Sequence, residues 1–479
     1  MLYHSTRNKN IKASSAEAIL RGLAPDGGLY VPYKIEPFES GIEEFVGLEY
    51  KEVLTKVLHK FFDEFRIEDI KECINKAYDG NFDITNIVDI HKTKDRYYLE
   101  LFHGKTLAFK DMALAILPHL MNLSKEYLKV NYTTYIVVAT SGDTGKATLE
   151  AFSNIDGFEI FVIYPKEGVS KTQELQMITH NSNNCRVFGI DGNFDDAQSF
   201  VKSIMDDDKL NQRLINKNIR LGAANSINIG RLIPQIAYYI YTCAYLIDKD
   251  EITKDKFVDF SVPTGNFGNI LAGIYAKKLG ANIGNLICAS NKNNVLYDFF
   301  KTGVYNINRD FYNTNSPSMD ILVSSNLERL IFDLYGEECT TFVMNELKSR
   351  GIYTINDLNC SYISSFYTSD NEVKEEIKRL FIEEGYIIDP HTAVASFAYN
   401  KFKESGNKTV IVSTASPYKF IETVLPALGE EDISYKKLEN ISGINIPKKL
   451  KNISKLKCVH NTSGNIKDIK EIIYNYIDS

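Results

Sequence analysis

The sequence has few features that would suggest a metal site or a disulfide framework. It contains seven cysteines among 479 residues, and no two of them form a Cys-x-x-Cys pair. The eight histidines are dispersed and show no spacing typical of metal ligands. We therefore expect no structural zinc site, no other bound metal and no set of disulfides.

Long apolar runs are also missing. The first fifteen residues have no apolar run after their charges, so they do not resemble a secretory signal. The longest apolar stretch, residues 232–247, contains Pro234 and Gln235 and is shorter than a membrane-spanning helix requires. We expect a buried helix there, a cytoplasmic location and no membrane partner.

An excess of basic residues is likewise absent. Lys and Arg total 55 against 62 Asp and Glu, which gives a formal net charge of -7. A general nucleic-acid binder usually carries a basic surface, so we expect no nucleic-acid partner. The length of 479 residues suffices for two or three domains with a substantial core.

The first 90 or so residues are expected to form a separate, mostly helical module. Ser14 and Glu17 fit a capping box, Gly22 fits a helix end, and residues 25–28 read as a turn. Residues 51–80 then carry apolar side chains at helical spacing. We assign residues 1–90 to this N-terminal module.

From about residue 95, short β-branched or aromatic runs alternate with amphipathic helices. The candidate strands are residues 134–139, 159–164, 186–190, 257–262, 286–289 and 409–413. Continuous apolar strands between helices are typical of parallel sheets covered on both faces, so we expect an α/β fold. We place the α/β region at 91–430 and assign no active role to a C-terminal segment at 431–479.

Three of these candidate strands end in small, polar or glycine-rich loops, at residues 140–145, 263–269 and 414–417. In open α/β sheets, ligands bind outside the carboxyl ends of the strands. One such loop would be weak evidence, since most glycine-rich turns only reverse the chain. Three of them indicate a ligand site.

The loop at 264–269 fits a phosphate site, because exposed backbone N–H groups at a helix start attract anions and glycine permits close approach. A plain strand-to-helix turn is the alternative. The loop at 141–146 suggests a nucleotide site, since Gly145 and Lys146 precede a helix. It does not fit a P-loop, because Thr140 replaces the first glycine and Ala147 replaces Ser or Thr.

Lys110 lies in the apolar segment 101–111 (LFHGKTLAFKD), whereas most lysines are solvated surface groups. Desolvation lowers the pKa of a lysine and leaves a free amine, as a Schiff base or a general base requires. Together with the phosphate loop, Lys110 suggests a pyridoxal-phosphate (PLP) enzyme.

The segment 225–231 (NSINIGR) offers neutral donors and one forked cation, Arg231, before a helix. Such a set suits a phosphate dianion. The alternative is a helix cap with an exposed arginine.

Five segments occur in the order and spacing of one family: LFHGKTLAFKD, ATSGDTG, NSINIGR, SVPTGNFGN and STASPYKF, over roughly residues 100–420. The opening YHSTR and the later GLAPDGGLYVP are similar to the N-terminal domain of the same family. The chain thus resembles threonine synthase. The resemblance implies PLP fold type II (tryptophan synthase β-like), with two open parallel-sheet α/β domains and a mostly helical N-terminal domain.

The resemblance also implies roles for individual residues. Lys110 would be the catalytic residue and would carry PLP as a Schiff base. The other cofactor-binding residues would be Gly265, Asn266, Phe267, Gly268 and Asn269 at the phosphate and Thr414 at the pyridine nitrogen. The substrate-binding residues would be Ser141, Asp143 and Thr144 near the carboxylate and Ser226, Asn228 and Arg231 at the phosphate. Lys105 and Ser416 depart from the family pattern, which has proline and histidine there.

The implied activity converts O-phospho-L-homoserine and water to L-threonine and phosphate by PLP-dependent γ-elimination and β-addition of water, the last step of threonine biosynthesis. We expect a monomer. A PLP lyase that deaminates serine or threonine is the nearest alternative, and Arg231 argues against it. A P-loop NTPase and a non-catalytic metabolite-binding protein are the others. An absorbance band near the visible edge that shifts with borohydride would distinguish a PLP enzyme from these two.

Overall fold

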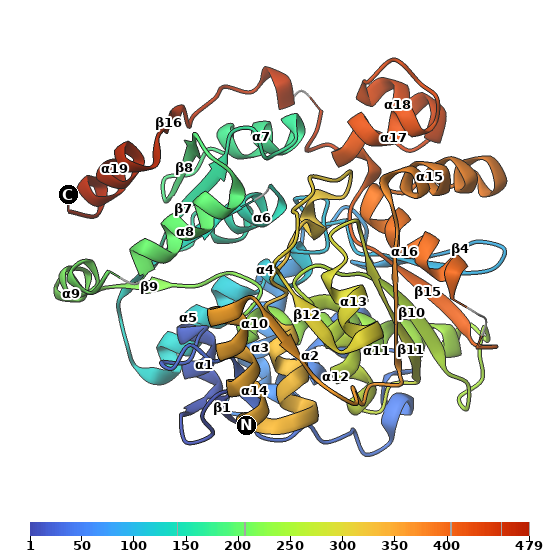
Figure 1. The fold of residues 1–479 in the computed structure, drawn as a ribbon, viewed down its shortest axis with the longest axis horizontal. Helices are drawn as coiled ribbons and strands as arrows, with labels where there is room; N and C mark the ends of the chain where they lie inside the picture. Colours follow the sequence, from blue (N-terminus) through green and yellow to red (C-terminus); the bar gives the residue numbers. More distant parts are fainter. Residues whose placement is uncertain (141, 206, 403–404, 452, 479) are drawn as a thin grey trace.

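Two sheets built mainly of parallel strands organise the chain in the computed structural model (Figure 1). The structure describes residues 1–140, 142–205, 207–402, 405–451 and 453–478. In Figure 1 the smaller of these two sheets lies at the left and the larger at the right, with helix α4 (Asp111–Leu114) between them. The expected α/β architecture is therefore present.

The larger sheet has six strands in the order β14-β11-β10-β15-β5-β4. All neighbours are parallel except β4, which pairs antiparallel with β5. Its strands are β4 (Asp89–Lys92), β5 (Tyr97–Glu100), β10 (Val258–Pro263), β11 (Ile283–Ser290), β14 (Ile363–Tyr367) and β15 (Lys408–Ser413). The central strands β10 and β15 are apolar and almost wholly buried, as strands covered on both faces are.

The smaller sheet has five parallel strands in the order β16-β8-β7-β6-β9. They are β6 (Thr133–Ala139), β7 (Phe158–Pro165), β8 (Cys185–Ile190), β9 (Ile219–Gly222) and β16 (Thr462–Gly464). Four of the five lie in sequence between β5 and β10, so the smaller sheet is an insertion within the larger one. All six strands expected from the sequence are confirmed, three in each sheet.

The C-terminal segment contributes to the smaller sheet. Strand β16 pairs with β8, and helix α19 (Ile466–Asp478) buries Ile469 and Ile473 in the core of that sheet. This segment therefore has a packing role that its composition did not suggest. The boundaries at residues 90 and 430 remain predictions.

The N-terminal module combines helices with a small antiparallel sheet. Helix α1 (Ser15–Arg21) has the expected capping box between Ser14 and Glu17 and ends at Gly22, whose φ is 68°. Helices α2 (Tyr50–Phe61) and α3 (Ile67–Tyr78) and the 3₁₀ helix η1 (Gly41–Phe45) follow. The sheet of β1 (Leu2–Ser5), β2 (Lys12–Ser14) and β3 (Tyr30–Pro32) was not predicted, because strands of three or four residues show too little alternation to be recognised.

The remaining elements cover the six-stranded and five-stranded sheets or connect their strands. The helices are α5 (Leu117–Leu128), α6 (Asp143–Phe152), α7 (Lys171–Ile178), α8 (Phe194–Met205), α9 (Asp208–Asn216), α10 (Ile229–Leu232), α11 (Ile236–Asp248), α12 (Gly268–Lys278), α13 (Val295–Thr302), α14 (Leu327–Arg350), α15 (Asp370–Glu384), α16 (Pro390–Lys401), α17 (Ile421–Ala427) and α18 (Tyr435–Ser442). Four short 3₁₀ helices are η2 (Ile233–Gln235), η3 (Pro317–Met319), η4 (Pro417–Phe420) and η5 (Ile453–Lys455), and β12 (Val304–Asn306) pairs with β13 (Ile352–Thr354).

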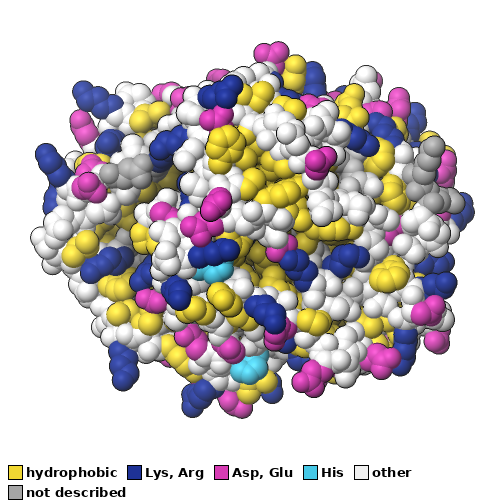
Figure 2. Space-filling view, turned by 60° about the horizontal axis from the view of Figure 1, so that its bottom comes forward, with side chains coloured by type: hydrophobic (Ala, Val, Ile, Leu, Met, Phe, Trp, Pro, Cys, Tyr) yellow, Lys and Arg dark blue, Asp and Glu magenta, His cyan; other side chains and the backbone are white. Residues whose placement is uncertain are grey.

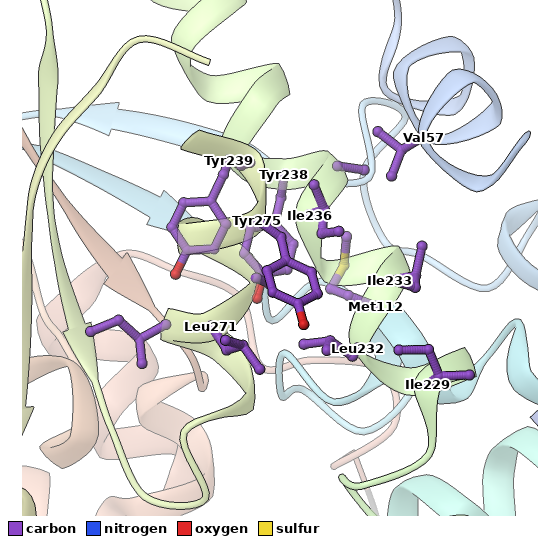
Figure 3. Packing of buried hydrophobic residues seen from close by; sticks show 14 of the residues in the cluster. Val57, Met112, Ile229, Leu232, Ile233, Ile236, Tyr238, Tyr239, Leu271 and Tyr275 are labelled. Carbon is purple, nitrogen blue, oxygen red and sulfur yellow. The ribbon is translucent and has the colours of Figure 1, made fainter. Parts of the chain in front are cut away.

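The run α10-η2-α11 is the buried helix expected from residues 232–247, and it joins the N-terminal module to the rest of the chain. Figure 3 shows its apolar side chains close to Val57 of α2, Met112 of α4 and Leu271 of α12. Within the described part of the chain, no helix combines the length and the apolar character that crossing a bilayer requires. The face in Figure 2 carries basic and acidic side chains interspersed.

Candidate active site

The loop before α4 places Lys110 beside the end of β15. The Phe109 N–H donates to the Thr414 carbonyl at 2.8 Å, and the Ser416 N–H donates to the Leu107 carbonyl at 3.0 Å. The Asp111 carboxylate, in turn, accepts bonds from the backbone and hydroxyl of Thr106, both at 2.7 Å. These bonds define the loop and bring together two predicted site residues, Lys110 and Thr414, that are distant in sequence.

Lys110 lies in an environment that favours its neutral amine. The side chain is 12% exposed, and burial lowers the pKa of its ammonium to about 8. Asp143, whose Oδ2 is 3.9 Å from Lys110 Nζ, opposes this change, while the charges of Lys419 and Arg231 reinforce it. The desolvation of Lys110 expected from the sequence is therefore present. The structure also places Arg231 close enough for its charge to act on Lys110.

Asp143 is shared between two lysines. Its Oδ1 lies 2.5 Å from the Nζ of Lys419, and it also accepts bonds from Gln173 at 2.9 Å and from Ser318 at 3.0 Å. Burial alone would raise the pKa of this carboxyl, but the charges of Lys419 and Lys110 and the two bonds from Lys419 and Gln173 hold it well below its usual range. Asp143 is thus a fixed anion.

The loop after β10 opens α12 and offers unused donors. Phe267 has a φ of 61°, which turns the chain into the helix at Gly268. Asn269 accepts bonds from the hydroxyls of Tyr238 at 2.6 Å and Tyr239 at 2.8 Å, whereas its buried Nδ2 is bonded by none of the described residues. A Cβ added at Gly268 would meet no described atom closer than 3.4 Å. An orphaned donor and a glycine at a helix start fit an anionic group such as a cofactor phosphate.

Gly265 and Asn266, the other two residues predicted for this loop, are held through their carbonyl groups. Ser324 donates to the Gly265 carbonyl at 2.7 Å. The Asn266 carbonyl accepts bonds from both the backbone and the side chain of Asn326, at 3.1 and 3.0 Å. The carbonyls of this loop are therefore bonded by residues directly before α14.

Arg231 is a buried cation with an incomplete set of partners. Its side chain is 4% exposed, and burial lowers the pKa of the guanidinium to about 10. Nη1 donates to the Ala224 carbonyl at 3.0 Å, but Nε is buried and has no hydrogen-bond partner among the residues that the structure describes. The alternative of an exposed arginine at a helix cap is therefore wrong. An unpaired buried guanidinium calls for an anion.

Asn228 and Ser226 belong to the same loop but are engaged differently. Asn228 caps α10 by accepting from the Gly230 N–H, and its amide donates to the carbonyls of Ile19 and Ala223. The Ser226 carbonyl accepts a bond from Asn326 at 3.2 Å. The structure therefore shows Asn228 supporting the loop, and direct contacts of Asn228 and Ser226 with a substrate remain predictions.

Two further predicted residues precede or begin α6. Thr144 is half-buried in the first turn, where its carbonyl accepts a bond from Thr148 at 2.8 Å. Ser141 lies outside the described residues. Asp143, by contrast, is engaged by the two lysines, so its expected proximity to a substrate carboxylate also stays a prediction.

The residues that connect the two loops were not found from the sequence. Asn326 donates to the carbonyls of Asn266 and Ser226, and Arg329 donates to those of Ile227 and Tyr30. Both side chains are fully buried at the start of α14. The polar residues before α14 would normally indicate a solvated helix cap. Nothing in the local sequence therefore shows that Asn326 and Arg329 connect the two loops. Lys419 lies in the segment STASPYKF, which contributes to the family resemblance, but no function was assigned to it from the sequence.

Comparisons with known proteins place the chain among pyridoxal-phosphate enzymes. Residues 2–78 match the family model for the threonine synthase N terminus, and residues 85–416 match that for pyridoxal-phosphate dependent enzymes. A threonine synthase from Methylobacillus glycogenes is 33% identical over 93% of this chain and 95% of its own length. Human threonine synthase-like 1 is 36% identical over 88% of this chain. The matched region covers only 58% of the length of that human protein.

Solved structures extend the likeness to the whole fold. PLP-bound threonine synthase from Brucella melitensis has a TM-score of 0.89 and 33% identity, with both chains covered completely. The yeast threonine synthase has a TM-score of 0.89 and 31% identity, over 100% of this chain and 99% of the other. Fold type II and the use of PLP, expected from the resemblance, are thereby confirmed. The chain belongs to the threonine synthase family of pyridoxal-phosphate-dependent enzymes.

Proposed function

We propose that this protein converts O-phospho-L-homoserine and water to L-threonine and inorganic phosphate. The observation that carries the proposal is the buried guanidinium of Arg231, whose Nε has no partner within the described part of the chain and whose charge acts on Lys110. A substrate with a phosphate would supply the missing anion within reach of the reactive amine. A lyase acting on serine or threonine would leave this cation unused.

Lys110 would both carry PLP and transfer the protons of the substrate. Because burial lowers the pKa of its ammonium to about 8, a substantial fraction of the amine is neutral near that pH. PLP, when bound, withdraws electrons from the substrate carbon that bears the amine and makes nearby C–H bonds acidic. A single flexible amine can then take a proton from Cα and a second from Cβ, which lets phosphate leave Cγ. Return of a proton at Cγ, addition of water at Cβ and return of a proton at Cα complete the conversion to threonine.

We assign the phosphate of the cofactor and the phosphate of the substrate to two different loops. We assign the start of α12, with Gly265, Asn266, Phe267, Gly268 and Asn269, to the phosphate of PLP. The orphaned Nδ2 of Asn269 supports this assignment. We assign Arg231, with Ser226 and Asn228, to the phosphate of the substrate. Thr414 would contact the pyridine nitrogen, and Ser141, Asp143 and Thr144 would lie near the substrate carboxylate.

Asp143 and Lys419 would set the electrostatics at Lys110. Lys419 forms a 2.5 Å ion pair with Asp143, which weakens the attraction of Asp143 for the Lys110 proton. A neutral hydroxyl from Thr414 would leave the pyridine nitrogen less protonated than a carboxylate would. Cytoplasmic location and a monomeric state remain expectations from the sequence.

The decisive experiment supplies purified, PLP-loaded protein with O-phospho-L-homoserine. Phosphate and threonine should appear in equal amounts, and threonine alone should yield little ammonia. Borohydride reduction and peptide mass spectrometry should place the pyridoxyl group on Lys110, and Lys110→Ala should lose turnover by orders of magnitude. Rapid deamination of threonine with no reaction of phosphohomoserine, or an adduct on Lys146 or Lys419 alone, would contradict the proposal.

A further inference from the structure

Helix α16 begins with a buried carboxylate and imidazole that have no part in the proposed function. Asp389 is the N-cap of this helix and accepts bonds from the backbone N–H groups of His391 at 2.9 Å and Thr392 at 3.1 Å. Oδ2 of the same carboxylate lies 2.7 Å from Nδ1 of His391. Because both side chains are buried and the cap fixes the carboxylate, the imidazole has one defined orientation.

The hydrogen bonds of His391 determine which of its ring nitrogens carries the proton. Nε2 lies 3.1 Å from the backbone nitrogen of Ser318, whose N–H group can only donate. Nε2 is therefore an acceptor without a proton, and Nδ1 carries the proton and donates it to Asp389. The imidazole is thus neutral and acts as a fixed acceptor for the 3₁₀ helix η3.

Helix η3 connects this imidazole with two parts of the active site. Ser318 uses its N–H group for His391 and its hydroxyl for Oδ2 of Asp143, at 3.0 Å. A Cβ added at Gly265, in the loop assigned to the PLP phosphate, would lie 3.3 Å from both the Ser318 carbonyl oxygen and Met319 Cα. The backbone of η3 therefore packs against the phosphate loop, while its serine bonds Asp143.

The bond from Ser318 reaches the carboxylate oxygen of Asp143 that faces the reactive lysine. Oδ1 of Asp143 is bonded by Lys419 and Gln173. Oδ2 accepts the bond from Ser318, whereas Lys110 Nζ lies 3.9 Å from it, beyond hydrogen-bonding distance. A hydroxyl donor at Oδ2 offsets part of the charge on that oxygen and holds the carboxylate at this distance from the amine.

We propose that Ser318 and His391 are positioning residues for the reactive lysine. The imidazole fixes η3, and the Ser318 hydroxyl then holds Asp143 too far from Lys110 Nζ for a direct hydrogen bond. Both residues act through Asp143 and not through contact with the substrate. The inference rests on the proposed function, since it takes the neutral amine of Lys110 as the reactive form.

Loss of the Ser318 hydroxyl should make Lys110 easier to protonate. Burial lowers the pKa of the Lys110 ammonium to about 8. Among the charged groups around it, Asp143 raises this pKa, whereas Lys419 and Arg231 lower it. In Ser318→Ala, Oδ2 of Asp143 is free to approach Nζ and bond the ammonium directly, so the pKa of Lys110 should rise by about half a unit or more.

Amine labelling of the full-length protein tests the proposal. Hydroxylamine and dialysis first remove PLP, and acetic anhydride is then added over a series of pH values, with a free amino acid as the internal reference. Peptide mass spectrometry measures acetylation of Lys110, whose rate should reach half its maximum near pH 8 in the wild type. The midpoint should be higher in Ser318→Ala and in His391→Leu. His391→Gln should restore it in part, because an amide oxygen can accept the Ser318 N–H.

Ser396→Ala is the matched control, because the buried Ser396 hydroxyl also donates to a carboxylate, that of Glu376, at 2.6 Å. Its loss should lower Tm without moving the midpoint. A midpoint in Ser318→Ala equal to that of the wild type would overturn the proposal, as would equal shifts in Ser318→Ala and Ser396→Ala or a wild-type midpoint typical of an exposed lysine. Ser318→Ala alone decides the question if His391→Leu does not fold. Labelling requires neither phosphohomoserine nor turnover, so failure here is distinguishable from failure of the proposed function.

Discussion

The Nζ atom of Lys419 lies 2.5 Å from Oδ1 of Asp143, and both side chains are buried. The other carboxylate oxygen of Asp143 faces Lys110 Nζ at 3.9 Å. One anion therefore serves two cations, and the closer cation is the one without an assigned catalytic role. From this geometry we expect Lys419 to influence the pKa of Lys110 through Asp143.

Lys419→Met should raise the pKa of Lys110. The change removes a repelling charge and leaves Asp143 free to attract the Lys110 proton, and both effects stabilise the ammonium. The rate of PLP uptake by the apoprotein requires the neutral amine, so it should rise with pH and reach half its maximum near pH 8 in the wild type. In the variant this midpoint should move to higher pH.

Lys125→Met is the control for this measurement. Lys125 is also a buried lysine, and burial lowers its pKa to about 8, but its ammonium donates to the Gly157 carbonyl at 3.0 Å. Its removal should leave the midpoint for PLP uptake unchanged. A midpoint that stays constant, or falls, in Lys419→Met would refute the assigned role.

Gly268→Val should weaken the retention of PLP while leaving the chain folded. A Cβ at this position meets no described atom closer than 3.4 Å, so the side chain would occupy the space next to the helix start. Dialysis followed by absorbance should show reduced cofactor occupancy. Gly464→Val, at the partly exposed strand β16, should retain PLP fully. Equal occupancy in the two variants would count against the phosphate role of the loop.

Arg231→Ala should lower kcat/KM for O-phosphohomoserine by about tenfold to a hundredfold or more, since a charge-assisted hydrogen bond contributes roughly 1.5–3 kcal/mol. Arg231→Lys should recover only part, because the forked geometry is lost. PLP content should stay normal in both, as the cofactor phosphate is assigned to a different loop. Steady-state kinetics that remain at the wild-type level would exclude Arg231 as the phosphate ligand.

Asn326→Ala should affect stability, cofactor retention and kcat/KM together. The fully buried amide donates to the carbonyls of Asn266 and Ser226, so the substitution removes the side-chain bond to the Ser226 carbonyl, at roughly 1–3 kcal/mol, and one of the two bonds to the Asn266 carbonyl, which keeps the bond from the Asn326 backbone N–H. Thermal unfolding should show a lower Tm, and dialysis should remove PLP more readily. Ser325→Ala, at the preceding residue, removes a hydroxyl that donates to Asn266 Oδ1 at 3.4 Å and should change little. Similar effects of both substitutions would contradict the connecting role.

The sequence was most informative where local pattern and chemistry coincide. Apolar strands that end in polar loops predicted β6, β10 and β15 together with the ligand loops that follow them. Lys110 could be recognised because an isolated lysine in an apolar segment is unusual. The strands β5 and β14 were not predicted, since YYLE and ISSFY are short and mix polar with apolar residues.

The connections between distant segments could not be predicted. Nothing in the local sequence around Asn326 shows that its amide reaches residues 226 and 266, because hydrogen bonds across 60 or 100 positions depend on the final packing. The same holds for the Lys419–Asp143 pair. The N-terminal sheet was missed for a different reason, which is that its strands rely on backbone pairing and not on an alternating pattern.

The pairing of β16 with β8 has a consequence for how the protein is made. Thr462 is the register partner of Phe188, and most of the larger sheet is encoded between them. At roughly 5–20 residues per second, a ribosome needs on the order of tens of seconds to cover that interval. During this time β8 is an open sheet edge, which is a site for pairing with other nascent chains. The edge of the smaller sheet can therefore be completed only after residues 462–464 have emerged.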